Sequence, residues 1–89
     1  MMPDDAKYTV RVLADHGHVG ETAPRGIVLL DGEYNDLVTR SPDAQRDENC
    51  IIIEGMKFYP LSAVKDRIPY TVYERANAGI PAMWWKPLE

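Results

Sequence analysis

The segment from Cys50 to Tyr59 constrains the fold more than any other part of the sequence. Two apolar runs, Ile51-Ile52-Ile53 and Met56-Lys57-Phe58-Tyr59, flank the dipeptide Glu54-Gly55. Runs rich in β-branched and aromatic residues on both sides of a short turn signal are typical of a β-hairpin. The sequence therefore predicts a hairpin at the centre of a small, mainly β domain.

Three other segments have patterns that favour strands. Alternation of apolar and mixed positions over 7–14 predicts a first strand, because side chains of a strand point alternately to its two faces. The continuous apolar run over 27–30 predicts a second strand, buried on both faces or near an edge. In the tail, 70–75 and 80–86 are predicted as two strands joined by 76–79. The alternative for the tail is a short helix over 72–78, with a capping box of Thr71 and Glu74 and a stop at Gly79.

The remaining segments predict helical turns and loops. Tyr34, Leu37 and Val38 share one helical face, so 33–40 is predicted as a short helical turn that Asp31 can cap. A single turn is expected over 60–66, with Leu61 and Val64 facing inward. Polar segments at the N-terminus, 1–6, and in the middle, 41–49, are expected to be flexible and exposed, respectively.

Together these elements predict a mainly β fold, with α+β as the alternative. The expected architecture is a small, partly open barrel of SH3-like type, with about five short strands and one or two helical turns. A chain of 89 residues with 45% hydrophobic composition can build one core, so 1–89 is predicted to be a single domain. Barrels of this type host many unrelated functions, so the fold alone implies no activity.

Composition narrows the class of protein. A single cysteine excludes an internal disulfide and favours a reducing compartment. The acidic N-terminus lacks the pattern of a signal peptide, and no apolar run approaches the ~20 residues that span a bilayer. A cytoplasmic protein is therefore expected. The net charge of −4 argues against nucleic-acid binding through bulk electrostatics.

Three groups of residues are candidates for chemistry, and each also has a simpler explanation. His16 and His18 can share a metal, but spacing identifies no third ligand among Asp15, Glu21 and Cys50, so a loop with two hydrogen-bonding histidines is favoured. Cys50 can act as a thiol nucleophile, yet its place before Ile51 favours packing in the core. The carboxylates within 31–36 could act as an acid and base pair, but a chain of 89 residues leaves little room for a deep apolar cleft that would raise the pKa of one of them. The sequence predicts no enzyme, no cofactor and no metal.

The aromatic tail gives the best functional indication. Consecutive Trp84 and Trp85 on a strand point to opposite faces, so at most one of them can be in the core. The other is a natural binding anchor, because Trp, Tyr and Arg dominate interface hot spots. The alternative is that the tail crosses the end of the barrel and buries both rings.

These observations predict a non-catalytic protein-binding module that acts as a regulator or inhibitor. Its compact, acidic, single-domain character resembles small accessory proteins of bacterial viruses. Its acidic surface is expected to occupy the basic groove of a nucleic-acid-handling complex and block it. The expected partner is another protein with a basic surface, and an exposed strand edge can also pair two copies into a homodimer. The predicted contact residues are three apolar anchors and an acidic rim that raises the association rate: Trp84, Trp85, Tyr73, Asp31, Glu33, Asp36, Asp47 and Glu48.

Two other classes of function stay open at the level of sequence. One is a small-barrel nucleic-acid binder, with Tyr59 and Tyr73 for base stacking and Lys57, Arg75 and Lys86 for phosphate contact. The other is a metal-dependent enzyme or sensor that uses His16 and His18.

Overall fold

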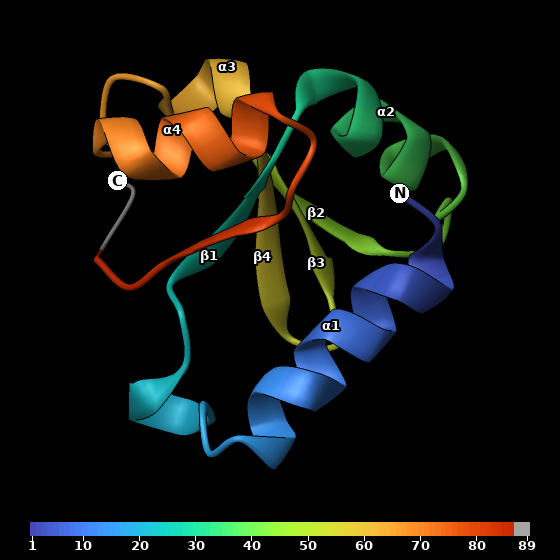
Figure 1. The fold of residues 1–89 in the computed structure, drawn as a ribbon. Helices are drawn as coiled ribbons and strands as arrows, with labels where there is room; N and C mark the ends of the chain where they lie inside the picture. Colours follow the sequence, from blue (N-terminus) through green and yellow to red (C-terminus); the bar gives the residue numbers. More distant parts are fainter. Residues whose placement is uncertain (87–89) are drawn as a thin grey trace.

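A computed structural model describes residues 1–86, and in this range the chain forms a mixed α+β fold around a five-stranded sheet (Figure 1). The sheet order is β2-β3-β4-β1-β5, in which β1 and β4 are parallel and the other neighbours are antiparallel. The bounds are β1 Gly26–Leu29, β2 Gln45–Asp47, β3 Cys50–Ile53, β4 Met56–Pro60 and β5 Ala82–Trp84. The sheet does not close, so the α+β alternative describes the fold and the predicted barrel does not form.

The sheet stays open because helices bury both of its faces. Helices α1 (Pro3–Asp15) and α2 (Asp31–Thr39) pack on one face, and α3 (Leu61–Val64) and α4 (Tyr70–Asn77) pack on the other. We call the buried side chains on the α1/α2 face the first core: Ala6, Leu13, Ile27, Leu29, Tyr34, Leu37, Ile51, Ile53, Met56 and Phe58. Those on the α3/α4 face are the second core: Val28, Cys50, Tyr59, Leu61, Val64, Val72, Ala76 and Ala82.

Strand β1 and the central hairpin confirm the two clearest strand predictions. All residues of β1 are buried, and they alternate between the two cores, as expected for a strand covered on both sides. In the hairpin, Ile53 pairs with Met56 across Glu54 and Gly55, whose φ angles are 51° and 79°. Two positive φ angles are those of a type I′ turn, in which glycine at the second position avoids strain.

Helix α1 contradicts the strand predicted over 7–14. Ala6, Val10 and Leu13 lie at i, i+4 and i+7 and pack into the first core, whereas Tyr8 of the apparent alternation is exposed. Pro3 stands at the start of the helix and is followed by two acidic residues in the first turn, both favourable at a helix N-terminus. The helix therefore begins inside the range 1–6 that the sequence suggested was flexible, and it buries Ala6 completely.

Helix α4 contradicts the strand favoured over 70–75. Val72 and Ala76 lie one helical turn apart and enter the second core, so the less favoured helical alternative is correct. The helix stops before Gly79, whose φ of 83° is costly for other residues. Pro69 is the N-cap residue and no side chain caps the helix, so Thr71 and Glu74 form no capping box there. The final strand is shorter than the predicted 80–86.

The remaining segments follow their predictions with two differences. Helices α2 and α3 correspond to the predicted helical turns, and Leu61 and Val64 are buried as expected. Asp31 does not cap α2, because Leu30 is the N-cap residue and Asp31 is already the first residue of the helix; the Asp31 carboxylate accepts a hydrogen bond from the Ser62 amide at 3.0 Å. The segment 41–49 is largely exposed, but it contains β2, an edge strand that the polar composition did not indicate.

Candidate functional site

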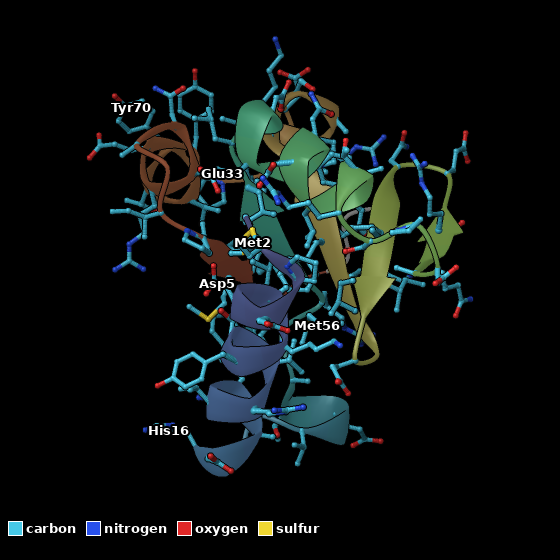
Figure 2. The ribbon with its side chains drawn as sticks, turned by 90° about the vertical axis from the view of Figure 1, so that its right-hand side faces the viewer. Met2, Asp5, His16, Glu33, Met56 and Tyr70 are labelled. Carbon is cyan, nitrogen blue, oxygen red and sulfur yellow. The ribbon has the colours of Figure 1, made fainter. Side chains whose placement is uncertain are left out.

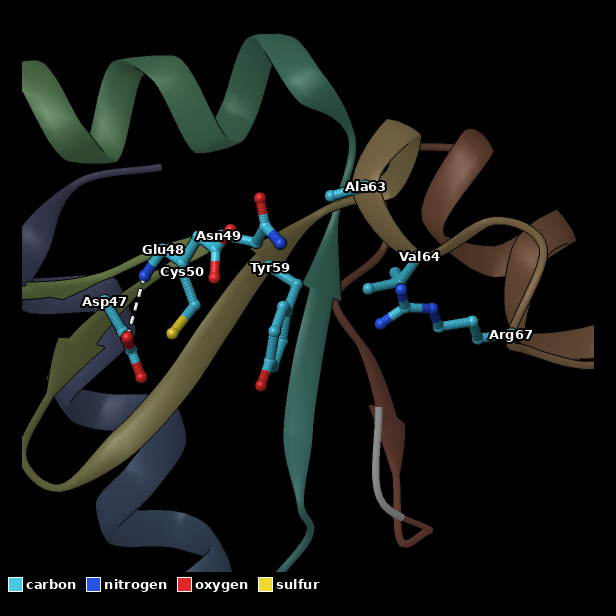
Figure 3. A pocket seen from close by; sticks show the side chains of 8 residues that line it. All are labelled: Asp47, Glu48, Asn49, Cys50, Tyr59, Ala63, Val64 and Arg67. Atoms are coloured by element: carbon cyan, nitrogen blue, oxygen red, sulfur yellow. Dashed lines mark hydrogen bonds between the residues drawn. The ribbon is translucent and has the colours of Figure 1, made fainter. Parts of the chain in front are cut away.

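A cavity of about 390 Å³ opens on the α3/α4 face of the sheet, beside the turn between β2 and β3 (Figure 3). Cys50 and Tyr59 enter it from neighbouring strands, and Arg67 approaches it from the segment after α3. The other lining residues are Asp47, Glu48, Asn49, Ala63 and Val64. The volume is within the range of small-molecule sites, so the chemistry of its lining decides what it can do.

Cys50 has the features of a structural thiol. Its pKa lies above the ordinary value, first because burial disfavours the thiolate and second because the Asp47 carboxylate is near. The charge of Lys57 and a hydrogen bond with Tyr59 offset part of this rise. A thiol nucleophile needs the opposite shift and an adjacent base, and the described residues that line the cavity include no histidine. The arrangement therefore supports packing rather than nucleophilic catalysis.

The two histidines, which follow α1, have different contact partners. The Nδ1–H of His16 donates to the Val12 carbonyl at 2.8 Å, and the His18 ring meets the Trp85 ring at 66° with 5.7 Å between centroids. Cys50 lies in the second core, on β3. Within residues 1–86, no group of three or more His, Cys, Asp or Glu side chains is placed to hold a metal ion.

The acidic residues of α2 are engaged with cations of the chain itself. The Met1 ammonium lies 2.8 Å from the Glu33 carboxylate and 3.0 Å from that of Asp36, and Glu33 is seen beside the start of α1 in Figure 2. Arg40 also donates to Asp36 at 2.9 Å. Burial acts to lower the pKa of the ammonium, but hydrogen bonds to Glu33 and Asp36 outweigh it and raise that pKa. These partly exposed carboxylates therefore connect α2 to the N-terminus of the chain, directly before α1.

Asp36 makes the stability of the protein depend on pH in the acid range. The hydrogen bond from Arg40, followed by that from the Met1 ammonium, holds the pKa of Asp36 below its ordinary value. A carboxylate with a lowered pKa stabilises the fold above its unfolded-state pKa, and the contribution is lost as pH falls through the folded-state pKa.

We expect Asp36→Asn to lower the urea midpoint at about pH 7, and the difference from wild type to shrink as pH falls through the lowered pKa of Asp36, below which both side chains are neutral. Urea titrations of both proteins at several pH values measure this. An equal difference at both ends of the range would show that Asp36 acts through something other than its charge.

The predicted aromatic anchors, Tyr73, Trp84 and Trp85, lie on α4 and at the β5 edge of the sheet. Tyr73 packs partly against the second core, and Tyr70 stacks on it with a centroid distance of 6.1 Å. Trp84 also packs against the second core, and the ammonium of Lys86 lies 6.0 Å from the centroid of its ring. The indole N–H of Trp84 is buried and has no hydrogen-bond partner within the described part of the chain.

Trp85 lies on the opposite side and is 45% exposed. Its indole N–H donates to the carbonyl of Thr22 at 3.2 Å, in the short 3₁₀ helix η1 (Gly20–Thr22). The His18 ring makes an edge-to-face contact with the indole. Val19, directly before η1, is also exposed. The two indoles thus contact different parts of the fold, one against the second core and one beside η1, where its ring is held in place but not covered.

The structure separates the predicted contact residues into distinct surfaces. Asp31, Glu33 and Asp36 are on α2, and Asp47 and Glu48 are at the turn between β2 and β3. Tyr73 is on α4, Trp84 ends β5 and Trp85 follows it, and β2 and β5 are the opposite edges of the sheet (Figure 1). The acidic residues therefore do not form a rim around the aromatic anchors.

The residues proposed for base stacking are also poorly placed for that role. Tyr59 is buried among the side chains of the second core, so its ring face cannot stack on a nucleotide. Tyr73 is partly buried, and Tyr70 already stacks on it.

Sequence reasoning missed the residues that hold Trp85. Thr22 and His18 both lie more than sixty positions before Trp85 in the sequence; for Thr22 the separation is 63 residues. Thr22 supplies only a main-chain carbonyl, so no side-chain pattern marks it. The pairing of β5 with β1 brings these segments together.

Comparisons with protein-family models, with curated proteins and with solved structures give no match to this chain. None of the helices in residues 1–86 has both the length and the apolar character needed to cross a bilayer.

Proposed function

We propose that this chain is a non-catalytic protein-binding module that regulates or inhibits a partner protein. One observation carries the proposal: Trp85 is an indole fixed by Thr22 and His18, yet 45% of it faces solvent. A rigid, half-exposed tryptophan loses little conformational freedom when it binds and supplies a large apolar contact. Trp84 and Tyr73 are partly buried against the second core, so in this proposal they offer less ring surface to a partner than Trp85 does.

The acidic residues favour a second contact with a basic surface. The carboxylates that favour this contact belong to Asp31, Glu33 and Asp36 on α2 and to Asp47 and Glu48 at the β2–β3 turn. Carboxylates in this number favour a partner with clustered Lys and Arg, such as a protein that handles nucleic acid, and they raise the rate of encounter. In this proposal the module occupies the basic groove of such a partner and blocks it.

The proposal is tested by affinity capture from the source cells, followed by measurement of Kd with the purified partner. We expect Trp85→Ala to weaken binding by about thirtyfold or more, because a hot-spot residue contributes about 2 kcal/mol or more. Tyr8→Ala is the matched control, since Tyr8 is an exposed aromatic residue on α1. Circular dichroism and melting curves of both variants check that the fold is kept.

Equal affinities of wild type, Trp85→Ala and Tyr8→Ala for the partner would exclude Trp85 as the anchor. Charge reversal at Asp47 and Glu48 tests the acidic contact separately. We expect it to lower the association rate and the salt dependence of binding, while Trp85→Ala changes mainly the dissociation rate.

A further inference from the structure

The two edges of the sheet differ in how they are protected. Strand β2 is an edge whose residues Gln45, Arg46 and Asp47 are all exposed, and charged side chains on an edge discourage the addition of another strand. Strand β5 is the other edge, and the segment from Ile80 to Trp85 contains no charged residue. Within residues 1–86, Pro81 and the shortness of β5 are the features that discourage strand addition at this edge.

The main chain of Met83 faces outward from the sheet. The Trp84 carbonyl accepts a hydrogen bond from the Arg25 amide at 2.8 Å, so the polar groups of Trp84 point towards β1. In a strand these groups alternate between the two sides from one residue to the next. The N–H and C=O of Met83 therefore point away from β1, and within residues 1–86 no further strand pairs with β5 on that side.

Apolar side chains lie at both ends of this open edge. Ile80, directly before Pro81, is 54% exposed, and Trp85 follows the strand. The side chain of Met83 itself packs against the first core. A chain lying along β5 therefore meets apolar contacts at either end and unpaired main-chain groups between them.

The charges that border β5 differ in sign from the net charge of the chain. Arg25, Arg75 and Lys86 are exposed, and all three residues adjoin this segment. The Arg25 amide donates to the Trp84 carbonyl, the Arg75 carbonyl accepts a hydrogen bond from the Ile80 amide at 3.0 Å, and the Lys86 ammonium approaches the Trp84 ring. The acidic residues of the adjoining elements are Glu21 in η1 and Glu74 in α4. Among residues 1–86, the basic residues that adjoin this uncharged edge therefore outnumber the acidic ones.

We infer that the edge of β5 binds an extended, acidic segment of a partner protein as an added β-strand. The inference rests on the proposed function: the acidic segment belongs to the same partner and lies against Trp85, whereas the basic groove of that partner faces the acidic residues of α2 and of the β2–β3 turn. The added strand pairs with the main chain of Met83, and an apolar residue of it lies against Trp85. Its carboxylates face Arg25, Arg75 and Lys86.

The probe is a displayed library of random peptides selected against the full chain. We expect the selected peptides to be rich in Asp and Glu, to alternate apolar and polar residues and to lack internal proline. Backbone amide spectra should then show the largest shifts over residues 80–86. Peptides rich in Lys and Arg, a helical spacing of apolar residues, or no enrichment would each overturn the inference.

Met83→Pro and Met83→Ala separate strand addition from side-chain contact. Both variants remove the same packing against the first core, but only proline removes the N–H, and proline is tolerated on an edge where that N–H faces solvent. We expect Met83→Pro to bind the selected peptide at least about tenfold more weakly than Met83→Ala, because the hydrogen bond donated by the N–H of residue 83 is lost. Melting curves confirm that both variants fold.

The outcomes distinguish the inference from the proposed function. If Trp85→Ala loses the peptide but Met83→Pro binds as well as Met83→Ala, strand addition is wrong and the tryptophan anchor stands. If Trp85→Ala binds the peptide normally, the proposed site itself is wrong. If the chain sediments as a dimer that Met83→Pro converts to monomer, a second copy covers the edge and the acidic segment is not its occupant.

Discussion

Phe58→Ala is expected to lower the free energy of unfolding by about 3 to 5 kcal/mol, because truncation of a buried phenylalanine leaves a cavity as well as losing apolar contact. Phe58 is fully buried in β4, the strand that lies between β3 and β1, and it is among the largest of the fully buried side chains. Its ring lies in the first core, beneath α1 and α2. Natural domains are stable by only about 5 to 15 kcal/mol, so this one change removes a large part of the total.

Urea unfolding followed by circular dichroism measures the effect of Phe58→Ala. Tyr70→Ala is the control, since Tyr70 is an aromatic residue of α4 that is 72% exposed and points away from the body of the protein (Figure 2). We expect the control to change stability by about 0.5 kcal/mol or less, as is usual for surface substitutions. A Phe58→Ala midpoint close to that of wild type would contradict the assignment of β4 to the centre of the sheet.

The parts of the fold that the sequence predicted are those with a strong local signal. The Glu54-Gly55 turn specifies the hairpin by itself, because positive φ angles at two successive positions favour a residue such as glycine. The continuous apolar run of β1 requires burial on both faces, whatever covers it. These features depend on neighbours in the sequence and not on the rest of the chain.

The two helices that were predicted as strands lack such a signal. In α1, Tyr8, Val10 and Val12 alternate as in a strand, while Ala6, Val10 and Leu13 follow the period of a helix. Small residues such as Ala6 and Ala76 carry little weight in an apolar pattern, yet they are fully buried and bring their helices close to the sheet. The position of the other elements decides between the two periods, and a single sequence does not show it.

The candidate site depended even more on the tertiary arrangement. The sequence indicated correctly that Trp84 and Trp85 point in different directions, because that follows from extended backbone alone. It did not indicate that α2 and the β2–β3 turn lie away from β5, since the order of strands in the sheet separates them. Grouping acidic and aromatic residues into one surface was therefore beyond what spacing along the chain can support.

Ala6→Glu tests the least expected element, helix α1, and we expect it to lower the free energy of unfolding by about 3 kcal/mol or more. Ala6 is fully buried against the first core, so a glutamate there either places an unpaired carboxylate in an apolar environment or forces the start of α1 off the sheet. Tyr8→Glu, at an exposed position of the same helix, is the matched control and should be nearly neutral. Hydrogen exchange then locates the damage: with Ala6→Glu, the amides of α1 should lose protection before those of β1 and β4. Equal stability of the two variants would mean that residues 1–6 are flexible and that the first core forms without the beginning of this helix.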